Sequence, residues 1–242
     1  ATGSSSFELE AKTRESLAGR AERAVLLPLS LDERASTAGL SPIAADAART
    51  RELEVALVFG GFPRVVLSRD PQVALARLVE AYVIRDASDR FRIRHVAAFR
   101  KVLELAASQI GSLVNLSEWA AIAGVSNDTV ADYVALAEST HVLKRVPPFV
   151  GGRRAELTST PKVYFIDTGV RNQLFGGFSP LSERMDRGAL LENLVLTEIM
   201  KSVNPLLDTV RYWRTKSGAE VDFVVEHRGR ILAVEVKAGD PR

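Results

Sequence analysis

Four charged side chains share one face of an otherwise apolar hairpin, EVDFVVEHRGRILAVEVK, at residues 220–237. The apolar alternation on either side of the polar HRGR stretch is typical of two antiparallel strands. A symmetric turn at the centre of HRGR places Asp222 opposite Glu235 and Glu220 opposite Lys237. Three carboxylates and one amine therefore lie close together on a strand pair whose other residues resemble core.

The pairing of Asp222 with Glu235 needs a counter-charge, because like charges directly across a ladder destabilise a sheet. A divalent cation removes this repulsion. Facing Cβ atoms lie about 5 Å apart, so both carboxylates can reach one Mg²⁺ through bonds of about 2.1 Å. Lys237 would then lie beside a metal-bound water or a scissile phosphate. The hairpin geometry therefore predicts a site for a divalent cation such as Mg²⁺.

A second unusual carboxylate, Glu192, lies in the predicted helix RGALLENLVLTEIMKSV at residues 187–203. At 100° per residue it falls at the centre of the apolar face, and the predicted polar face holds Asn193, Thr197, Glu198 and Lys201. An ionised carboxylate on a buried face is costly without a cation or donors. Glu192 is therefore expected to point at the same site, or alternatively to pair with an arginine such as Arg211 or Arg214.

The second face of the hairpin is purely apolar and is expected to be buried. It pairs Val221, Phe223 and Val225 with Val236, Val234 and Leu232. A helix followed by three antiparallel strands predicts a small α/β domain over residues 176–242.

The preceding region, residues 109–175, has the spacing of a winged helix. Ser117 is expected to cap a short helix ending near Ala123, Gly124 to make the turn, and Ser126 to cap a second helix through Glu138. The segments HVLKRVPPF and KVYFIDTG then read as strands on either side of a GGRR turn, which is the place of a wing.

The second helix of this motif is a poor reader of DNA bases. Its available side chains include two acids and no Arg or Lys: Asn127, Asp128, Thr129, Asp132 and Tyr133. If DNA binds, the expected phosphate contacts are Lys144, Arg145, Arg153 and Arg154. The alternative is a domain used for packing or oligomerisation.

Residues 1–67 lack the opening elements of an independent domain. After the loop TGSSS they predict an amphipathic helix (FELEAKTRESLAG), a strand (AVLLPL), a linker, a helix (ARTRELEVALVF) and a GGFP turn. Residues 68–108 predict a helical linker or lid, capped by Asp70, with Pro71 at its first position and its end near Ala107. We expect residues 1–67 to complete a fold whose front is missing.

Composition narrows the class of protein. The chain has 242 residues, 46% hydrophobic and 26% charged, with a net charge of +2 and no cysteine. No apolar run approaches the roughly 18 residues of a membrane span. We expect a globular cytoplasmic protein without a membrane partner, in which a metal site uses oxygen ligands or one of the three histidines, His95, His141 and His227.

The carboxylates also resemble a known arrangement. A carboxylate on a helix, an Asp on a strand and E-x-K on the next strand are similar to the PD-(D/E)xK nuclease superfamily, although the PD element is absent here. The resemblance implies that Glu192, Asp222 and Glu235 hold the metal and that Lys237 assists attack.

Over nearly its whole length the chain resembles bacterial and archaeal AAA-type ATPases that carry a C-terminal domain of unknown function with this nuclease-like fold. The resemblance rests on TGSSS, SLAGR, LLPLS, GGFP, YVIRD, LENLVLTEI and YWRTKSGAEVDFVVE, in that order. It implies that Ser4 lies in a sensor-1 loop near a γ-phosphate and that Arg20 is a sensor or finger arginine. Since GxxxxGK[ST] and a Walker B acid are missing, it implies a piece truncated before sensor 1, with ATP bound only in the intact parent.

We therefore expect a mixed α/β, multidomain chain. Its parts are a remnant of an AAA-type ATPase module (1–67), the helical linker or lid (68–108), the winged helix (109–175) and the nuclease-like domain (176–242). The leading function is metal-dependent cleavage of DNA by the C-terminal portion of an ATPase. The alternatives are a catalytically inactive nucleic-acid-binding module and a protein-interaction or regulatory module, with the missing ATPase half or a second copy as partner.

Overall fold

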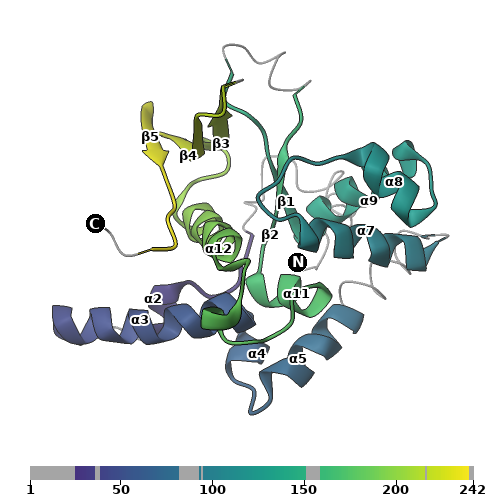
Figure 1. Cartoon of the computed structure of the whole chain (residues 1–242). Helices are drawn as coiled ribbons and strands as arrows, with labels where there is room; N and C mark the ends of the chain where they lie inside the picture. Colours follow the sequence, from purple (N-terminus) through teal and green to yellow (C-terminus); the bar gives the residue numbers. More distant parts are fainter. Residues whose placement is uncertain are drawn as a thin grey trace, which may run out of the picture.

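A computed structural model describes residues 25–35, 39–81, 93, 95–150, 159–215 and 217–239 (Figure 1). The architecture is mixed α/β, with helices along most of the chain and two small antiparallel sheets within these ranges. The predicted helix at residues 7–19 lies outside them, as do Ser4, Arg20, Arg153 and Arg154. None of the helices in these ranges is both long and apolar enough to cross a membrane.

The first described elements are helical: α2 (Leu31–Ala35), α3 (Pro42–Phe59), α4 (Pro63–Val66) and α5 (Pro71–Leu78). Helix α3 starts before the predicted residue 48, because the Ser41 side chain accepts from Ala44 N and Pro42 sits at the first position. The predicted strand AVLLPL is wrong over residues 25–29, which form no strand. Leu29 N donates to Gly61 O, but no ladder partner extends this contact into a sheet.

The helical region expected from Asp70 to about Ala107 contains two described helices. Asp70 does cap α5, accepting from Val73 N, and α7 (Val96–Ser108) supplies the far end. Between them, His95 has φ −124° and ψ 76°, which is outside the helical region. An interruption in the backbone therefore separates two helices that share one periodic pattern.

The next elements follow the order expected of a winged helix: α7, α8 (Leu116–Ala123), α9 (Asn127–Ser139), β1 (Leu143–Val146) and β2 (Lys162–Phe165). Gly124 ends α8 in the left-handed region at φ 69°, and Ser126 caps α9 as predicted. The cap of α8 is Asn115 rather than Ser117, because the Asn115 side chain accepts from Glu118 N. Strands β1 and β2 pair antiparallel, with Leu143 opposite Phe165.

The last part contains α11 (Thr168–Leu174), the 3₁₀ turn η2 (Leu181–Glu183), α12 (Arg187–Ser202), β3 (Thr209–Arg214), β4 (Glu220–His227) and β5 (Arg230–Val234). The three strands form an antiparallel sheet in the order β3-β4-β5. Arg228 and Gly229 both have positive φ, 51° and 74°, as a two-residue hairpin turn requires. The predicted register is confirmed where the strands pair, with Phe223 opposite Val234 and Val225 opposite Leu232.

Helix α12 is buried on two sides, because it lies between two clusters of core residues. Leu190 and Leu194 belong to the larger cluster with α7, α9 and β2, whereas Leu196 packs with Tyr164 and Phe223 in the smaller one. The predicted polar face of α12 is therefore wrong at its centre: Asn193 and Thr197 are buried.

Asn193 replaces a strand partner at the edge of β2. Its Oδ1 accepts from Phe165 N and its Nδ2 donates to Phe165 O, both at 2.8 Å. These bonds satisfy a buried peptide and fix β2 against α12.

The apolar face of the hairpin is covered only in part, because Val234 of β5 packs against the smaller core cluster and Leu232 on the same face does not. Leu232 is 60% exposed and Ile231 63% exposed, while Phe223 and Val225 on β4 are buried. Within the described chain β5 is an edge strand, and α12 packs on the middle of the sheet. The alternation of side chains predicts which residues share a face, and it does not predict how far across the sheet that face is covered.

The segment after β1 and the C-terminal sheet are joined through backbone hydrogen bonds. Tyr212 N donates to Pro147 O at 3.0 Å, and Phe149 N donates to Tyr212 O at 2.5 Å. Pro148 and Tyr212 consequently form a parallel bridge between the strand after β1 and β3. Val146 of β1 and Tyr164 of β2 pack in the same smaller core, beside α12 and β4.

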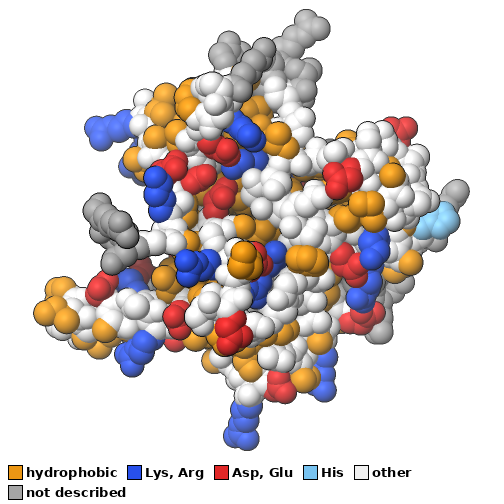
Figure 2. Space-filling view, viewed as in Figure 1, with side chains coloured by type: hydrophobic (Ala, Val, Ile, Leu, Met, Phe, Trp, Pro, Cys, Tyr) orange, Lys and Arg blue, Asp and Glu red, His pale blue; other side chains and the backbone are white. Residues whose placement is uncertain are grey.

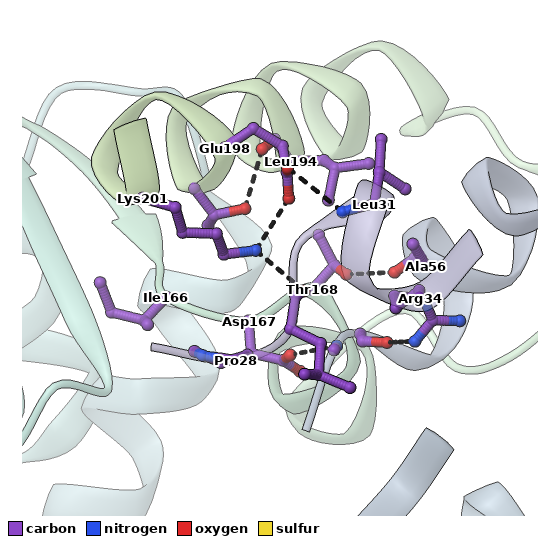
Figure 3. Close-up of a pocket in the computed structure, with 14 residues that line it drawn as sticks. Pro28, Leu31, Arg34, Ala56, Ile166, Asp167, Thr168, Leu194, Glu198 and Lys201 are labelled. Atoms are coloured by element: carbon purple, nitrogen blue, oxygen red, sulfur yellow. Dashed lines mark hydrogen bonds and ion pairs between the residues drawn. The ribbon is translucent and has the colours of Figure 1, made fainter. Parts of the chain in front are cut away.

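A small pocket between the first helices and α12 is closed by polar contacts (Figure 3). Asp167 is buried; its Oδ2 accepts from Gly61 N at 2.7 Å and its Oδ1 from Val170 N at 3.0 Å. Above the same pocket, Lys201 donates to Leu29 O at 3.0 Å. The cavity holds about 10 Å³, which is about the room that one water needs. The hydrogen bond from Gly61 to Asp167 joins the GGFP and IDTG segments. The cavity itself is too small for a ligand.

A buried network of charges also fixes the start of α12. Both Arg171 and Arg184 bind the Asp186 carboxylate, and both also reach Asn172 Oδ1. The hydrogen bond from Arg184 is the main reason that the pKa of Asp186 falls to about 2. A lowered carboxyl pKa stabilises the fold above the unfolded-state pKa, and this contribution is lost as the pH falls through the folded-state value.

We predict that Asp186→Asn lowers the free energy of unfolding near pH 7 by about 1–2 kcal/mol through lost charge pairing, allowing for solvent screening. The gap from wild type should shrink between about pH 4 and pH 2, as the wild-type carboxyl takes up its proton. Urea unfolding at several pH values measures this gap, with Asp32→Asn, which breaks an exposed pair with Arg49, as the control. A gap that stays constant down to pH 2 would contradict the assignment.

Candidate functional site

A cluster of charges centres on Glu192, where α12, β2 and β4 meet. Lys162 Nζ lies 3.2 Å from Glu192 Oε1 and 2.5 Å from Glu220 Oε1. The Tyr164 hydroxyl donates to Glu192 Oε1 at 2.5 Å. The Lys162 side chain is 5% exposed and that of Glu192 is 17% exposed. The buried carboxylate thus has one cation and one hydroxyl donor from the same strand.

The local structure explains why these groups meet. Lys162 and Tyr164 are two residues apart on β2, so both project to the same side of the strand. Lys162 Nζ also lies over the Tyr212 ring, 5.6 Å from its centre, which is within reach of a cation–π contact. The carboxylate of Glu192 lies under Gly111 (φ 74°), where a Cβ would come 3.2 Å from Oε2. A side chain at this turn would therefore crowd the carboxylate.

Electrostatics support a charged Lys162. Burial alone lowers the pKa of its amine, but Glu220 and Glu192 more than offset burial, so the pKa of Lys162 lies above its ordinary value. Burial raises the pKa of Glu192, while the hydrogen bond from Tyr164 and the charge of Lys162 act in the opposite direction. The pKa of Tyr164 rises, first through burial and then through the charge of Glu192. Tyr164 therefore acts as a neutral donor.

Asp222 lies near this cluster and is held by the backbone. The pKa of Glu192 is raised mainly by burial, and the negative charge of Asp222 raises it further. Asp222 Oδ2 accepts from Val236 N at 2.7 Å. This hydrogen bond holds the segment that follows β5 against β4.

Glu235 and Lys237, the E-x-K pair, lie after the end of β5. Their side chains are 51% and 79% exposed, and Lys237 Nζ is 4.0 Å from Glu235 Oε1. Neither side chain forms an ion pair with Glu192 or Asp222 in the described chain. Among the described residues, no three Asp, Glu, His or Cys side chains are placed to hold a metal ion. The structure thus brings Glu192 and Asp222 together with Glu220, and leaves the E-x-K pair at the surface.

As arranged, these residues do not fit a divalent cation. The position between Glu192 and Glu220 is taken by Lys162 Nζ, which carries the compensating charge. Asp222 is bonded to the backbone. The metal ligation implied for Glu192, Asp222 and Glu235 stays a prediction.

Two of the residues predicted to contact phosphate, Lys144 and Arg145, lie beside an acidic side chain. Arg145 Nε binds Glu138 Oε2 at 2.7 Å, and Lys144 Nζ lies 3.9 Å from Glu138 Oε1. Tyr133 is buried in α9 and packs edge-on against Phe99, so it does not lie on a free recognition surface. Acidic and basic side chains alternate over the face that Figure 2 shows. DNA binding by Lys144 and Arg145 stays a prediction.

Sequence reasoning missed Lys162 and Tyr164. The alternatives it offered as partners for Glu192 are placed elsewhere: Arg211 pairs with Glu226, and Arg214 Nε lies 3.8 Å from Glu220 Oε2. A signal was available, because the strand KVYF alternates two polar-tipped side chains with two apolar ones, and a lysine inside a buried strand needs a carboxylate.

The comparisons with known proteins give two family matches. The model of a domain of unknown function, DUF8612, matches residues 50–181, and that of a second such domain, DUF4143, matches residues 187–241. Uncharacterized proteins of Mycobacterium tuberculosis and Mycobacterium bovis are each 28% identical over 240 residues, covering 97% of this chain and 51% of their own length. An uncharacterized protein of Haemophilus influenzae is 24% identical over 185 residues, 74% of this chain and 44% of its own. The chain spans about half the length of these curated relatives, and no solved structure matches it.

Proposed function

Because the chain belongs to the DUF8612 family of domains of unknown function, we propose that it is a non-cleaving interaction and regulatory module of an AAA-type ATPase. Two observations support the link to an ATPase. The second matched domain, DUF4143, is often found with AAA ATPases. The curated relatives are about twice as long, which leaves room for another module in those proteins.

The observation that carries the non-cleaving assignment is the closed acidic cluster. Lys162 neutralises the carboxylate of Glu192, and Tyr164 donates a hydrogen bond to it. A metal-dependent nuclease would need this carboxylate free to bind its metal ion. The cation comes from the wing, so the site acts as a junction between two parts of the chain. We propose that its role is to hold the wing on the C-terminal sheet, and that the partner bound by the assembled module is the ATPase half.

A second candidate function is metal-dependent cleavage of DNA. One observation favours it: Glu192 on α12 and Asp222 on β4 are close enough for their charges to interact. The proximity of two carboxylates is necessary for such a site and does not by itself provide a bound metal or an activated water.

Plasmid nicking separates the two functions. We predict that the wild-type chain, with Mg²⁺ or Mn²⁺, nicks supercoiled plasmid no faster than Asp222→Ala and Lys237→Ala do, because no open metal site is available. Both variants alter groups that cleavage would require, and Glu183→Ala, an acid on η2 away from the cluster, serves as the matched control. Metal-dependent nicking by the wild type and the control that both site variants lose would establish cleavage and overturn the proposal.

A further inference from the structure

We propose that the free edge of β5 binds an extended segment of a partner protein, which adds to the β3-β4-β5 sheet as an antiparallel strand and carries acidic side chains at its C-terminal end. This inference rests on the proposed function, because it names the surface and the kind of segment through which an interaction module would bind. It uses the edge of the sheet and none of the side chains of the cluster around Glu192.

The backbone of β5 has one unpaired side in the described chain. It is the last strand in the order β3-β4-β5, and Figure 1 shows it on the outer side of the sheet, away from β1 and β2. Because the two-residue turn makes His227 and Arg230 a hydrogen-bonded pair, every second residue of β5 from Arg230 onward bonds to β4. The residues between, Ile231 and Ala233, therefore direct their N–H and C=O groups outward. Such a row of unpaired groups is a template for another strand.

Large apolar side chains lie at this edge and beside the hairpin turn. Ile231 and Leu232 are exposed on β5, and the strand contains no proline that would block pairing. Leu206 and Leu207 are 88% and 76% exposed at the same end of the sheet, since the residue after them accepts a hydrogen bond from the hairpin turn. Exposed apolar side chains that gather in one region are typical of a surface that another chain covers.

The charge at this edge indicates which kind of segment fits. Arg228 and Arg230 are exposed and form no ion pair with another described residue. Residues 228–239 contain these two arginines and Lys237 against a single carboxylate, Glu235. An acidic segment complements this excess of positive charge. A second copy of β5, paired antiparallel about the middle of the strand, would place its Arg228 near Lys237, and like charges across a ladder are unfavourable.

Antiparallel pairing fixes the order of side chains in the added strand. Arg230, Leu232 and Val234 share one face of β5, so alternate residues of the partner lie opposite them in reverse order. Apolar residues then oppose Val234 and Leu232, and acidic residues come next to Arg230 and Arg228. From its N-terminus to its C-terminus, the predicted segment reads apolar-x-apolar-x-acidic-x-acidic.

Fluorescence anisotropy of a labelled peptide, Val-Thr-Val-Thr-Glu-Thr-Glu with both ends blocked, tests the inference on the 242-residue chain. We expect saturable binding with a Kd of about 100 µM. The reversed peptide, Glu-Thr-Glu-Thr-Val-Thr-Val, has the same composition. It should bind at least about tenfold more weakly, because antiparallel pairing places its acids away from the arginines.

Backbone methylation of the peptide tests the pairing itself. The first two threonines lie opposite Ala233 and Ile231, so their N–H groups point at β5. N-methylation of both should abolish binding, because it removes the donors and keeps the side chains. N-methylation of the second valine, whose N–H points away from β5, is the matched control and should leave binding within about twofold.

On the side of the chain, Arg230→Glu should weaken binding by at least about tenfold. Arg64→Glu, which reverses an exposed arginine on α4, is the matched control and should bind like the wild type. Far-UV circular dichroism checks that both variants fold.

Three results would each overturn the inference: no saturable binding, equal binding of the two peptide orders, or binding that survives methylation of the threonines. A stable dimer of the chain that the peptide does not dissociate would assign the edge to a second copy and overturn it as well. Plasmid nicking does not involve β5, so its result tests the proposed function separately.

Discussion

Lys162→Ala should lower the free energy of unfolding by about 3 kcal/mol, among the largest effects that the structure predicts. Breaking a buried ion pair from one side typically costs about 3–5 kcal/mol, because the remaining charge stays buried without a partner. Glu192 and Glu220 are 17% and 30% exposed, which places the expected loss near the lower end of that range. Urea unfolding at pH 7, in a metal-free buffer, measures it.

A double-mutant cycle separates the lost charge from the lost packing. Lys162→Met keeps most of the volume and removes the charge, and Glu192→Gln removes the opposite charge while it keeps an acceptor for the Tyr164 hydroxyl. The two changes together should cost less than the sum of their separate costs, with a coupling energy of at least about 1 kcal/mol. Strictly additive costs would mean that the two side chains do not interact in solution as they do in the structure.

Gly60→Ala should destabilise the chain by at least about 3 kcal/mol or prevent folding. Gly60 has φ 73° and ψ −165°, a conformation that glycine adopts and other residues avoid. A Cβ at this position would lie 2.0 Å from Asp167 Oδ1. Since Asp167 is fully buried and bonded to Gly61 N and Val170 N, it has little room to move away.

The matched control for this prediction is Gly124→Ala. Gly124 also has a positive φ, 69°, but a Cβ there would meet nothing within 4 Å. Its substitution should therefore cost only the backbone strain of about 1–2 kcal/mol. The difference between the two alanine variants, measured by chemical unfolding, isolates the close approach of Gly60 to Asp167. Similar losses at both positions would show that this approach is not tight.

Local features of the fold were the ones that the sequence could predict. The hairpin register followed from alternation around a two-residue turn, and the end of α8 and the start of α9 followed from Gly124 and Ser126. These features depend on neighbours along the chain. The two-sided burial of α12 was missed because the periodicity of one helix identifies its most apolar face and does not count the elements packed around it.

Only part of the candidate site could be predicted, because some of its residues are distant from one another in sequence. Glu192 could be identified because a carboxylate on an apolar face needs a partner, but the identity of the partner depends on β2, which is distant in sequence. The E-x-K residues were expected in the site because they continue the hairpin pattern. In the structure the ladder ends at Val234, so Glu235 and Lys237 follow an exposed edge strand and stay at the surface.

The most direct test of the central claim, that Lys162 and Tyr164 close the carboxylate cluster around Glu192 to a metal ion, is a calorimetric titration of Mn²⁺ into the wild-type chain. We predict that the wild type gives no saturable heat up to about 1 mM Mn²⁺. Saturable binding by the wild type that Asp222→Ala or Glu192→Gln abolishes would contradict the claim and restore the metal-dependent nuclease as the better account.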